Sequence, residues 1–383
     1  MKKNDEANER EIHAETRAED SMTDPPEENI SENPSASESS EGADVDVKNG
    51  AALAAESASE PQVKLSRRER IRRKWYMRGA RALFRAIDIV FYGPQNSCPY
   101  VNRRNSKTIR VEKDIVYDDE LSDVCVLDFY EVPSDEAKPA VLLIHGGGFS
   151  AGGKKYRKGL AQYFALNGFA VFSIDYGLAP KYVFPEPIRH IVNAANFVYD
   201  NAQRFNIDAS KIITTGDSAG GYFSAMLAAF NCNDRLGDVF GFAPKFRIFG
   251  TILDCGLYDL QTVFNTKYIL NVDDAVFLSF IGIRENDYDE YIYKDCCTPI
   301  EHITKDFPPT YVISAAADIL CKGQSDVLIE KFKQCGVYYE CYESHKFIAN
   351  HCFPLLWRTP DAIAANEGMM EFAHKLINGE IAQ

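Results

Sequence analysis

KIITTGDSAGG, residues 211–221, is the most informative segment of this chain. The apolar residues at its start predict a buried strand, and the Ala-rich residues after it, up to Phe230, predict a helix. Between them lies Gly-x-Ser-x-Gly, the pattern of a nucleophile elbow, a tight strand-to-helix turn that exposes a serine hydroxyl. Side chains at Gly216 and Gly220 would crowd such a turn. A glycine-rich loop with a chance serine is the alternative, but the context favours Ser218 as a nucleophile.

A serine nucleophile needs a general base, and the base needs an orienting carboxylate. After a nucleophile elbow of this kind, the acid and then the histidine follow in the chain. Asp318 ends the apolar run at residues 311–317 and precedes a predicted helix, which makes it the candidate acid. Asp254, at the end of the preceding predicted strand, is its rival. An ordinary helix cap at Asp318 is the structural alternative.

The base must be one of seven histidines. Five are eliminated because they precede Asp318 or lie within a predicted helix. His345 and His351 remain, both in the loop after the last predicted strand and both followed two residues later by Phe. The residues alone leave both open.

Hydrolysis also needs hydrogen-bond donors for the oxyanion of the tetrahedral intermediate. His-Gly-Gly-Gly at residues 145–148 follows the third predicted strand, where this fold class builds part of the oxyanion hole. The backbone amides of Gly147 and Gly148 are the best candidates, with Gly146 as a further one and the amide of Ala219 beside the nucleophile. The histidine of this motif is expected to brace the loop. A nucleotide-binding P-loop is excluded because no Gly-Lys-Ser/Thr follows.

Strand and helix patterns alternate after residue 105. The predicted strands are 107–117, 125–132, 140–145, 170–175, 211–215, 249–255, 309–315 and 337–343, and the predicted helices are 156–167, 187–204, 218–230, 322–335 and 360–377. The first two strands are joined by a short turn, which indicates an antiparallel start; the others alternate with helices, which indicates parallel pairing. We therefore expect an α/β-hydrolase fold with a mostly parallel eight-stranded sheet, helices on both faces and a helical cap.

Composition divides the 383-residue chain into parts. Residues 1–64 hold 17 acidic and 6 basic residues and no aromatic one, which predicts a disordered acidic tail. The remainder, with 39 acidic and 36 basic residues, is nearly neutral, so nothing indicates a nucleic-acid partner. No signal peptide and no long apolar span is found, and we expect a cytoplasmic protein. The sequence indicates no oligomeric state.

Residues 65–105 begin with a basic amphipathic segment. Residues 65–92 carry nine Lys or Arg and two acidic residues, with apolar residues at helical spacing. A helix packed over the active site as part of a cap is the favoured interpretation, and a helix in peripheral contact with an anionic membrane surface is the alternative. We assign residues 106–383 to the catalytic domain, with a cap insertion at about 257–306, where the alternating pattern breaks.

The ten cysteines are irregularly spaced and include no Cys-x-x-Cys pair. Free thiols are expected, with no structural metal and no metal in the mechanism. Nothing in the sequence predicts a cofactor.

Together, residues 145–148, 216–221 and 351–353 resemble the hormone-sensitive-lipase-like branch of the α/β-hydrolases, and the similarity covers about residues 107–378. The resemblance implies hydrolysis of carboxylic esters without a cofactor, under a cap made of N-terminal helices and an insertion after the sixth strand. It favours His351 over His345, because the distance from His351 to the last helix matches the family.

The chain also departs from this family. The family usually has Arg where Gly177 stands and a carboxylate where His190 stands, and its terminal His-Gly-Phe is here His-Cys-Phe. We expect Ser218, His351 and Asp318 to act on small to medium acyl esters, as a cofactor-free serine esterase. An amidase or carbohydrate deacetylase with the same triad is one alternative, and a non-catalytic ligand-binding protein of the same fold is another.

Overall fold

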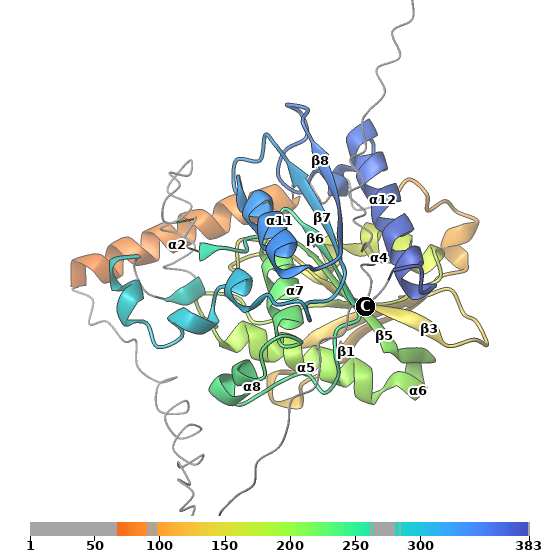
Figure 1. Ribbon diagram of the computed structural model, residues 1–383, viewed down its shortest axis with the longest axis horizontal. Coiled ribbons are helices and arrows are strands. Elements are labelled where there is room, and N and C mark those ends of the chain that lie inside the picture. The colour runs from red at the N-terminus through yellow and green to blue at the C-terminus, as the bar shows by residue number, and fades with distance from the viewer. Residues whose placement is uncertain are drawn as a thin grey trace, which may run out of the picture.

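The chain folds around an eight-stranded sheet with the strand order β1-β2-β4-β3-β5-β6-β7-β8 (Figure 1). The computed structural model describes residues 67–89, 93, 98–260, 263, 280–282 and 285–381. The strands are β1 Arg110–Val116, β2 Val126–Glu131, β3 Lys138–Ile144, β4 Ala170–Ile174, β5 Ile207–Asp217, β6 Gly250–Asp254, β7 Thr310–Ala315 and β8 Tyr339–Ser344. The β1–β2 and β2–β4 pairs are antiparallel, and the other pairs are parallel. The predicted α/β fold and its antiparallel start are therefore confirmed.

The central strands are apolar on both faces, as expected for strands that helices cover on each side. In β3, Val141 contributes to one core cluster and Leu142 to the other, and both are fully buried. β3 is paired with β5 so that Ile144 lies opposite Gly216. Because parallel strands end at the same edge of a sheet, this register brings the loop after β3 next to the turn after β5.

Helices pack on both faces of the sheet (Figure 1). On one face lie α4 Lys158–Leu166 and α12 Pro360–Ile377; on the other lie α5 Glu186–Asp200, α7 Ala219–Ala229 and α11 Gln324–Cys335. Shorter helices are α6 Ala202–Phe205 and α8 Arg235–Phe240, with 3-10 turns η2 Asn105–Lys107, η3 Asp119–Leu121, η4 Lys154–Tyr156, η7 Glu285–Glu290, η8 Lys294–Cys296, η9 Pro299–His302 and η10 Phe353–Leu356. All residues of α7 are buried, which makes it a rigid base for the turn that precedes it.

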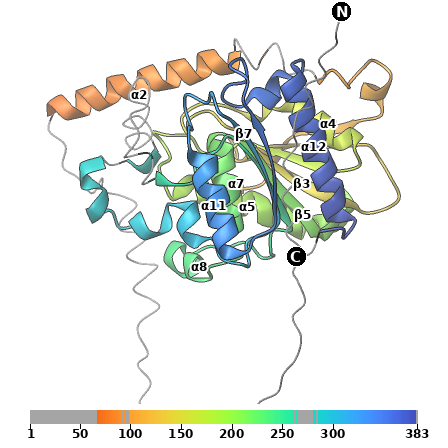
Figure 2. The ribbon, with the colours of Figure 1, turned by 45° about the horizontal axis from the view of Figure 1, so that its top comes forward.

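Helix α2, Arg67–Ile87, runs across one end of the domain, and its N-terminal part extends past the sheet (Figures 1 and 2). Near its C-terminal end Phe84 is buried, whereas Ile71 and Trp75 are 52% and 68% exposed. A helix thus occupies most of residues 65–92, and its last turns pack against the domain. Within the described part of the chain, no helix has the length and apolar character needed to span a bilayer.

Some predicted boundaries were wrong. Residues 187–204 form two helices because Asn201 leaves helical geometry and its side-chain amide donates a 2.8 Å hydrogen bond to the Phe197 carbonyl. Strand β5 begins at Ile207, four residues early, because Ile207 pairs with Lys138 ahead of the apolar core of the strand. Helix α8 was not predicted, since six residues carry too little periodic signal.

Part of the predicted domain organisation concerns residues that the structure does not describe. The acidic tail, residues 1–64, lies outside the described residues, and so do residues 261–262, 264–279 and 283–284 of the insertion at 257–306. The described end of this insertion consists of the 3-10 turns η7, η8 and η9. The division into tail, N-terminal helix and catalytic domain with a cap insertion stays a prediction.

Candidate active site

Ser218 lies in the turn between β5 and α7, with φ of 53° and ψ of −118°. Residues other than glycine rarely adopt positive φ, and such a conformation persists only where the surroundings enforce it. A Cβ atom at Gly216 would overlap the backbone of Gly220, and one at Gly220 would overlap the carbonyl of Ile144. The Ser218 N–H donates to the Asp254 carbonyl at 2.8 Å. Local sequence and strand packing together hold this strained turn.

Ser218 and His351 line the same small cavity. Its other walls include Gly147 of the loop after β3, Phe84 of α2, and Cys352. The candidate nucleophile and one of the two candidate bases therefore face a common space, which the end of α2 covers.

Asp318 and His351 are directly hydrogen-bonded. The His351 ring Nδ1 lies 2.9 Å from Oδ2 and 3.1 Å from Oδ1 of Asp318, and the Leu320 and Cys321 N–H groups donate to Oδ1 at 2.8 and 2.9 Å. Burial disfavours the charged form of both residues, yet their mutual attraction outweighs it. The pKa of Asp318 is therefore lowered and the pKa of His351 is raised. The carboxylate is held in place and ionised beside the imidazole.

Asn350 fixes the loop that carries this histidine. Its side-chain amide donates to the Ala317 carbonyl at 2.7 Å, and its side-chain oxygen accepts from the His351 N–H at 2.8 Å. The two loops that carry Asp318 and His351 are thereby joined by a residue that the sequence did not single out.

The other two candidates lie elsewhere. The His345 side chain is 77% exposed, and its Nε2 lies 3.5 Å from a carboxylate oxygen of Glu343. Asp254 is buried, and its pKa is raised to about 8 by burial and by the nearby charge of Asp217. Its backbone carbonyl, not its side chain, accepts the Ser218 N–H. The structure thus brings Asp318 and His351 together and leaves His345 on the surface.

The loop after β3 has the conformation of a glycine-dependent turn. Gly147 has φ of 132° and Gly148 has φ of 57°. The ring of Phe84 occupies the position that a Cβ atom would take at Gly148. The Gly146 N–H is directed at Asp217 Oδ1, 3.3 Å away. Ala219, whose amide is the other predicted donor, is the first residue of α7, so its N–H lies at a helix N-terminus.

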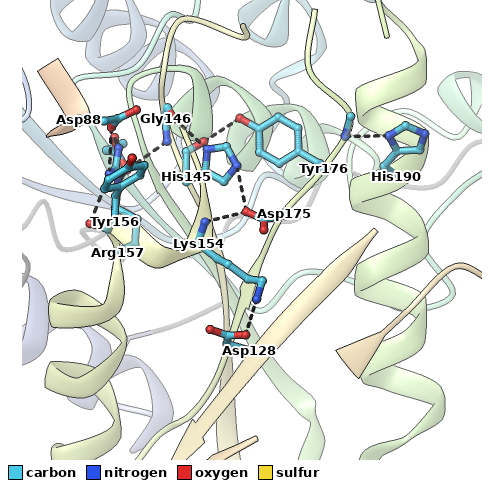
Figure 3. A network of polar contacts seen from close by, with 12 residues as sticks. Asp88, Asp128, His145, Gly146, Lys154, Tyr156, Arg157, Asp175, Tyr176 and His190 are labelled. Carbon is cyan, nitrogen blue, oxygen red and sulfur yellow. Dashed lines mark hydrogen bonds and ion pairs between the residues drawn. The ribbon is translucent and has the colours of Figure 1, made fainter. Parts of the chain in front are cut away.

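The His145 side chain lies between Gly146, Tyr176 and Asp175 (Figure 3). Its Nδ1 lies 2.8 Å from the Gly146 carbonyl, and its ring stacks on Tyr176 with the centroids 4.4 Å apart. The Tyr176 hydroxyl donates to the His145 carbonyl at 2.7 Å. His145 Nε2 lies 3.7 Å from Asp175 Oδ1 (Figure 3). These contacts fix the position of the loop backbone.

Arg157 is a buried residue that the sequence did not reveal. Its Nε and Nη2 donate to the two carboxylate oxygens of Asp217, both at 2.6 Å, and its Nη1 lies 3.6 Å from Asp88 at the end of α2. All three side chains are 3% exposed or less. Asp217, the residue before the candidate nucleophile, and Asp88, which follows α2, therefore share one guanidinium group. No motif marks this relationship, because the partners are far apart in the chain.

The two departures from the family pattern, Gly177 and His190, contact each other. The Gly177 N–H donates to His190 Nδ1 at 3.1 Å, and the imidazole occupies the place that a side chain would take at Gly177. Burial lowers the pKa of His190 to about 4, so it is a neutral acceptor here. A hydrogen bond to a neutral imidazole thus joins the loop at Gly177 to helix α5.

Comparisons with known proteins agree with this architecture. A protein-family model described as BD-FAE matches residues 127–332, more than half of the chain. Carboxylesterase NlhH of Mycobacterium tuberculosis is 36% identical over 121 residues, 31% of this chain and 38% of that protein. A putative alpha/beta hydrolase, R526, of Acanthamoeba polyphaga mimivirus is 35% identical over 91 residues, 24% of this chain and 26% of that protein. The matched segments span less than two fifths of these relatives.

Similar solved structures cover more of the chain at lower identity. Esterase B from Lactobacillus rhamnosis has a TM-score of 0.69 and 20% identity, over 81% of this chain and 98% of that one. A hyperthermophilic esterase from the archaeon Pyrobaculum calidifontis has a TM-score of 0.60 and 20% identity, over 84% of this chain and 100% of that one. These likenesses confirm the predicted fold.

Proposed function

This chain belongs to the BD-FAE family among the hormone-sensitive-lipase-like α/β-hydrolases, and we propose that it is a serine carboxylesterase. The observation that carries this proposal is the 2.9 Å contact between His351 Nδ1 and Asp318, with His351 and Ser218 on one cavity. Two relatives in the comparisons, NlhH and esterase B, are described as esterases, and one solved form of esterase B carries a tributyrin phosphonate, which supports the same chemistry.

In this mechanism Ser218 Oγ attacks the acyl carbonyl carbon while His351 Nε2 accepts the serine proton. Asp318 keeps the remaining ring proton on Nδ1 and stabilises the imidazolium that forms. His351 then donates the proton to the departing alkoxide, which leaves as the alcohol. Water attacks the acyl-enzyme with His351 again as the base, and Ser218 is regenerated.

The tetrahedral oxyanion is stabilised by backbone N–H groups of Gly147, Gly148 and Ala219 in this proposal. The Gly146 N–H supports the loop by its contact with Asp217 Oδ1. Each donor contributes on the order of 10²–10³-fold in rate in comparable enzymes. Glycine is required because the positive φ values of Gly147 and Gly148 are strained for other residues.

The substrate class follows from the walls of the cavity. Phe84, Ile87, Leu320 and Cys352 present mainly apolar surface next to Ser218. Such walls favour uncharged acyl groups over charged ones, which agrees with small to medium acyl esters as substrates. The end of α2 serves as part of a cap, since Phe84 lies directly over Gly148.

Turnover of p-nitrophenyl acetate and butyrate by four proteins tests the proposal. Ser218→Ala and His351→Ala should lower kcat by about 10⁴-fold or more, whereas His345→Ala should behave like the wild type. Loss of activity in His345→Ala but not in His351→Ala would overturn the assignment.

Two further measurements address the alternative activities. A fluorophosphonate probe should label the wild type and not Ser218→Ala; an unlabelled wild type would indicate a non-catalytic binding protein. Faster turnover of an anilide or of acetylated xylan than of simple esters would replace the proposed substrate class by an amide or a carbohydrate ester.

A further inference from the structure

Two cysteines lie directly beside the Asp318–His351 pair. Cys255 follows the end of β6, Cys352 follows His351, and each is 1% exposed. Both have positive φ, 48° and 51°, so the backbone at each is held in a fixed, unusual conformation. The two thiols interact as hydrogen-bond partners. Neither thiol has a part in the proposed ester hydrolysis.

The donor atoms of Cys255, Asp318 and His351 are close enough to share a metal ion. The Cys255 Sγ, a carboxylate oxygen of Asp318 and a ring nitrogen of His351 all lie within 4.8 Å of one another. In a tetrahedral zinc site the ligand atoms lie about 2.0–2.3 Å from the metal, and hence roughly 3.3–3.8 Å apart. Movements of about 1 Å, within the range of side-chain rotation, would bring these atoms to zinc distances.

The hydrogen bonds of Asp318 indicate which atoms would bind. Its Oδ1 accepts the Leu320 and Cys321 N–H groups, whereas its Oδ2 faces His351 Nδ1 at 2.9 Å. Oδ2 and Nδ1 can therefore turn from each other to a metal without releasing the loop that carries Asp318. His351 and Cys352 also line the cavity at Ser218, so the cluster lies next to the proposed active site.

We propose that Cys255, Asp318 and His351 form an inhibitory binding site for Zn²⁺. One thiolate, one imidazole and one carboxylate are a ligand set that suits zinc, whereas Mg²⁺ and Ca²⁺ prefer oxygen ligands. The site is a property of these three side chains and does not depend on the proposed function.

The inhibition does rest on the proposed function. Binding releases the Cys255 thiol proton to solvent, because the thiolate is the ligand. The metal takes the lone pair of His351 Nδ1, so the single proton of the neutral ring must sit on Nε2. Nε2–H cannot accept the proton of Ser218, and Asp318 no longer orients the ring. Zinc thus holds the histidine in the wrong tautomer for catalysis.

Metal binding is tested on the full chain, without reference to activity. With a non-thiol reductant present, Co²⁺ should produce a thiolate-to-cobalt charge-transfer absorption that one equivalent of Zn²⁺ abolishes and millimolar Mg²⁺ does not. Cys255→Ala should weaken zinc binding by at least about 10–100-fold, the loss that even an outer-shell partner causes. Cys255→Ser is made in parallel, and thermal unfolding verifies that each variant folds.

Cys98→Ala is the matched control, because Cys98 is also a free cysteine with 1% exposure. It should bind zinc as the wild type does. Ser218→Ala should also bind zinc normally, which separates the metal site from the esterase mechanism. Absence of the charge-transfer band, or equal zinc affinity of Cys255→Ala and Cys98→Ala, would overturn the site.

Activity is then measured against zinc concentration. Wild type should lose turnover of p-nitrophenyl acetate as the site fills and regain it with a chelator, and Cys255→Ala should need at least about 10-fold more zinc. Full activity of a zinc-saturated wild type would overturn the inhibition while leaving the site intact. A wild type without esterase activity would refute the proposed function, and the cobalt spectrum would still decide on the site.

Discussion

Arg157 binds Asp217 with two parallel hydrogen bonds of 2.6 Å, and both side chains are almost completely withdrawn from solvent. Asp217 lies one residue before Ser218, and Arg157 also faces Asp88, which follows α2. The pKa of Asp217 is lowered although burial opposes its ionisation, because the charge and hydrogen bonds of Arg157 favour the carboxylate. The pair therefore holds an ionised carboxylate on the residue next to the candidate nucleophile.

Replacing this arginine should be strongly destabilising. Arg157→Leu leaves the carboxylates of Asp217 and Asp88 without their shared cation, which should lower the free energy of unfolding by about 3–5 kcal/mol. Arg204→Leu is the control, because Arg204 is 51% exposed and lies 3.5 Å from Glu112; it should cost less than about 1 kcal/mol. Urea denaturation of both variants tests this, and equal losses would contradict it.

The pH dependence of stability should report on Asp88. Burial and repulsion from Asp217 outweigh the attraction of Arg157 and raise its pKa from 3.8 to about 6. The folded chain therefore binds this proton more tightly than the unfolded chain, so the contribution of Asp88 to stability falls as the pH rises through this window. Asp88→Asn should gain stability relative to the wild type between pH 4 and pH 7, measured by denaturation at both values. Asp135→Asn, at an exposed position, is the control; a pH-independent difference for Asp88→Asn would refute the prediction.

The contact between Phe84 and Gly148 can be tested by a double-mutant cycle. Gly148→Ala should lower kcat by up to about 10²-fold, because the added methyl group meets the Phe84 ring and displaces a proposed oxyanion donor. Phe84→Ala in the same chain should restore part of this loss. A residual defect should remain, since φ of 57° costs alanine about 1 kcal/mol. Strictly additive effects of the two changes on kcat would show that the residues are not in contact.

The exposed part of α2 makes a membrane experiment worthwhile. Ile71 and Trp75 lie one turn apart and are largely exposed, with exposed basic residues such as Lys74 and Arg78 nearby. Such a surface favours adsorption to anionic lipid. The chain should sediment with vesicles containing phosphatidylserine, less so at high salt, and the Ile71→Ser, Trp75→Ser double variant should remain in the supernatant. Equal sedimentation of the two proteins would refute adsorption to lipid through Ile71 and Trp75.

Much of the fold was predictable because its signals are local. All eight strands lie at predicted positions, and the central ones were located from apolar runs, since strands covered on both faces are continuously apolar. The break at Asn201 was missed because a single side-chain hydrogen bond decides it, and Asn also occurs inside helices. Helix α8 depends on its packing against the core through Leu236 and Phe240, which a six-residue window does not reveal.

The residues of the candidate site also fall into those that sequence motifs located and those that only the structure revealed. Motifs located Ser218 and Gly147, which lie together on the cavity because β3 and β5 are paired in parallel. Arg157 could not be found, because 60 residues separate it from Asp217 and an isolated arginine carries no pattern. The approach of Cys255 to Cys352 was hidden for the same reason. Such relationships arise from the sheet order, which brings distant loops to one edge.

The position of Asp88 sets a practical limit on shortening this protein. A chain trimmed to begin after α2 would lose this helix and Asp88 with it. Such a chain would lack the Phe84 wall of the cavity and one of the two carboxylates that share Arg157. Its rates, substrate preferences and pH profile would describe an altered protein, so kinetic work should retain the chain from at least Arg67 onward.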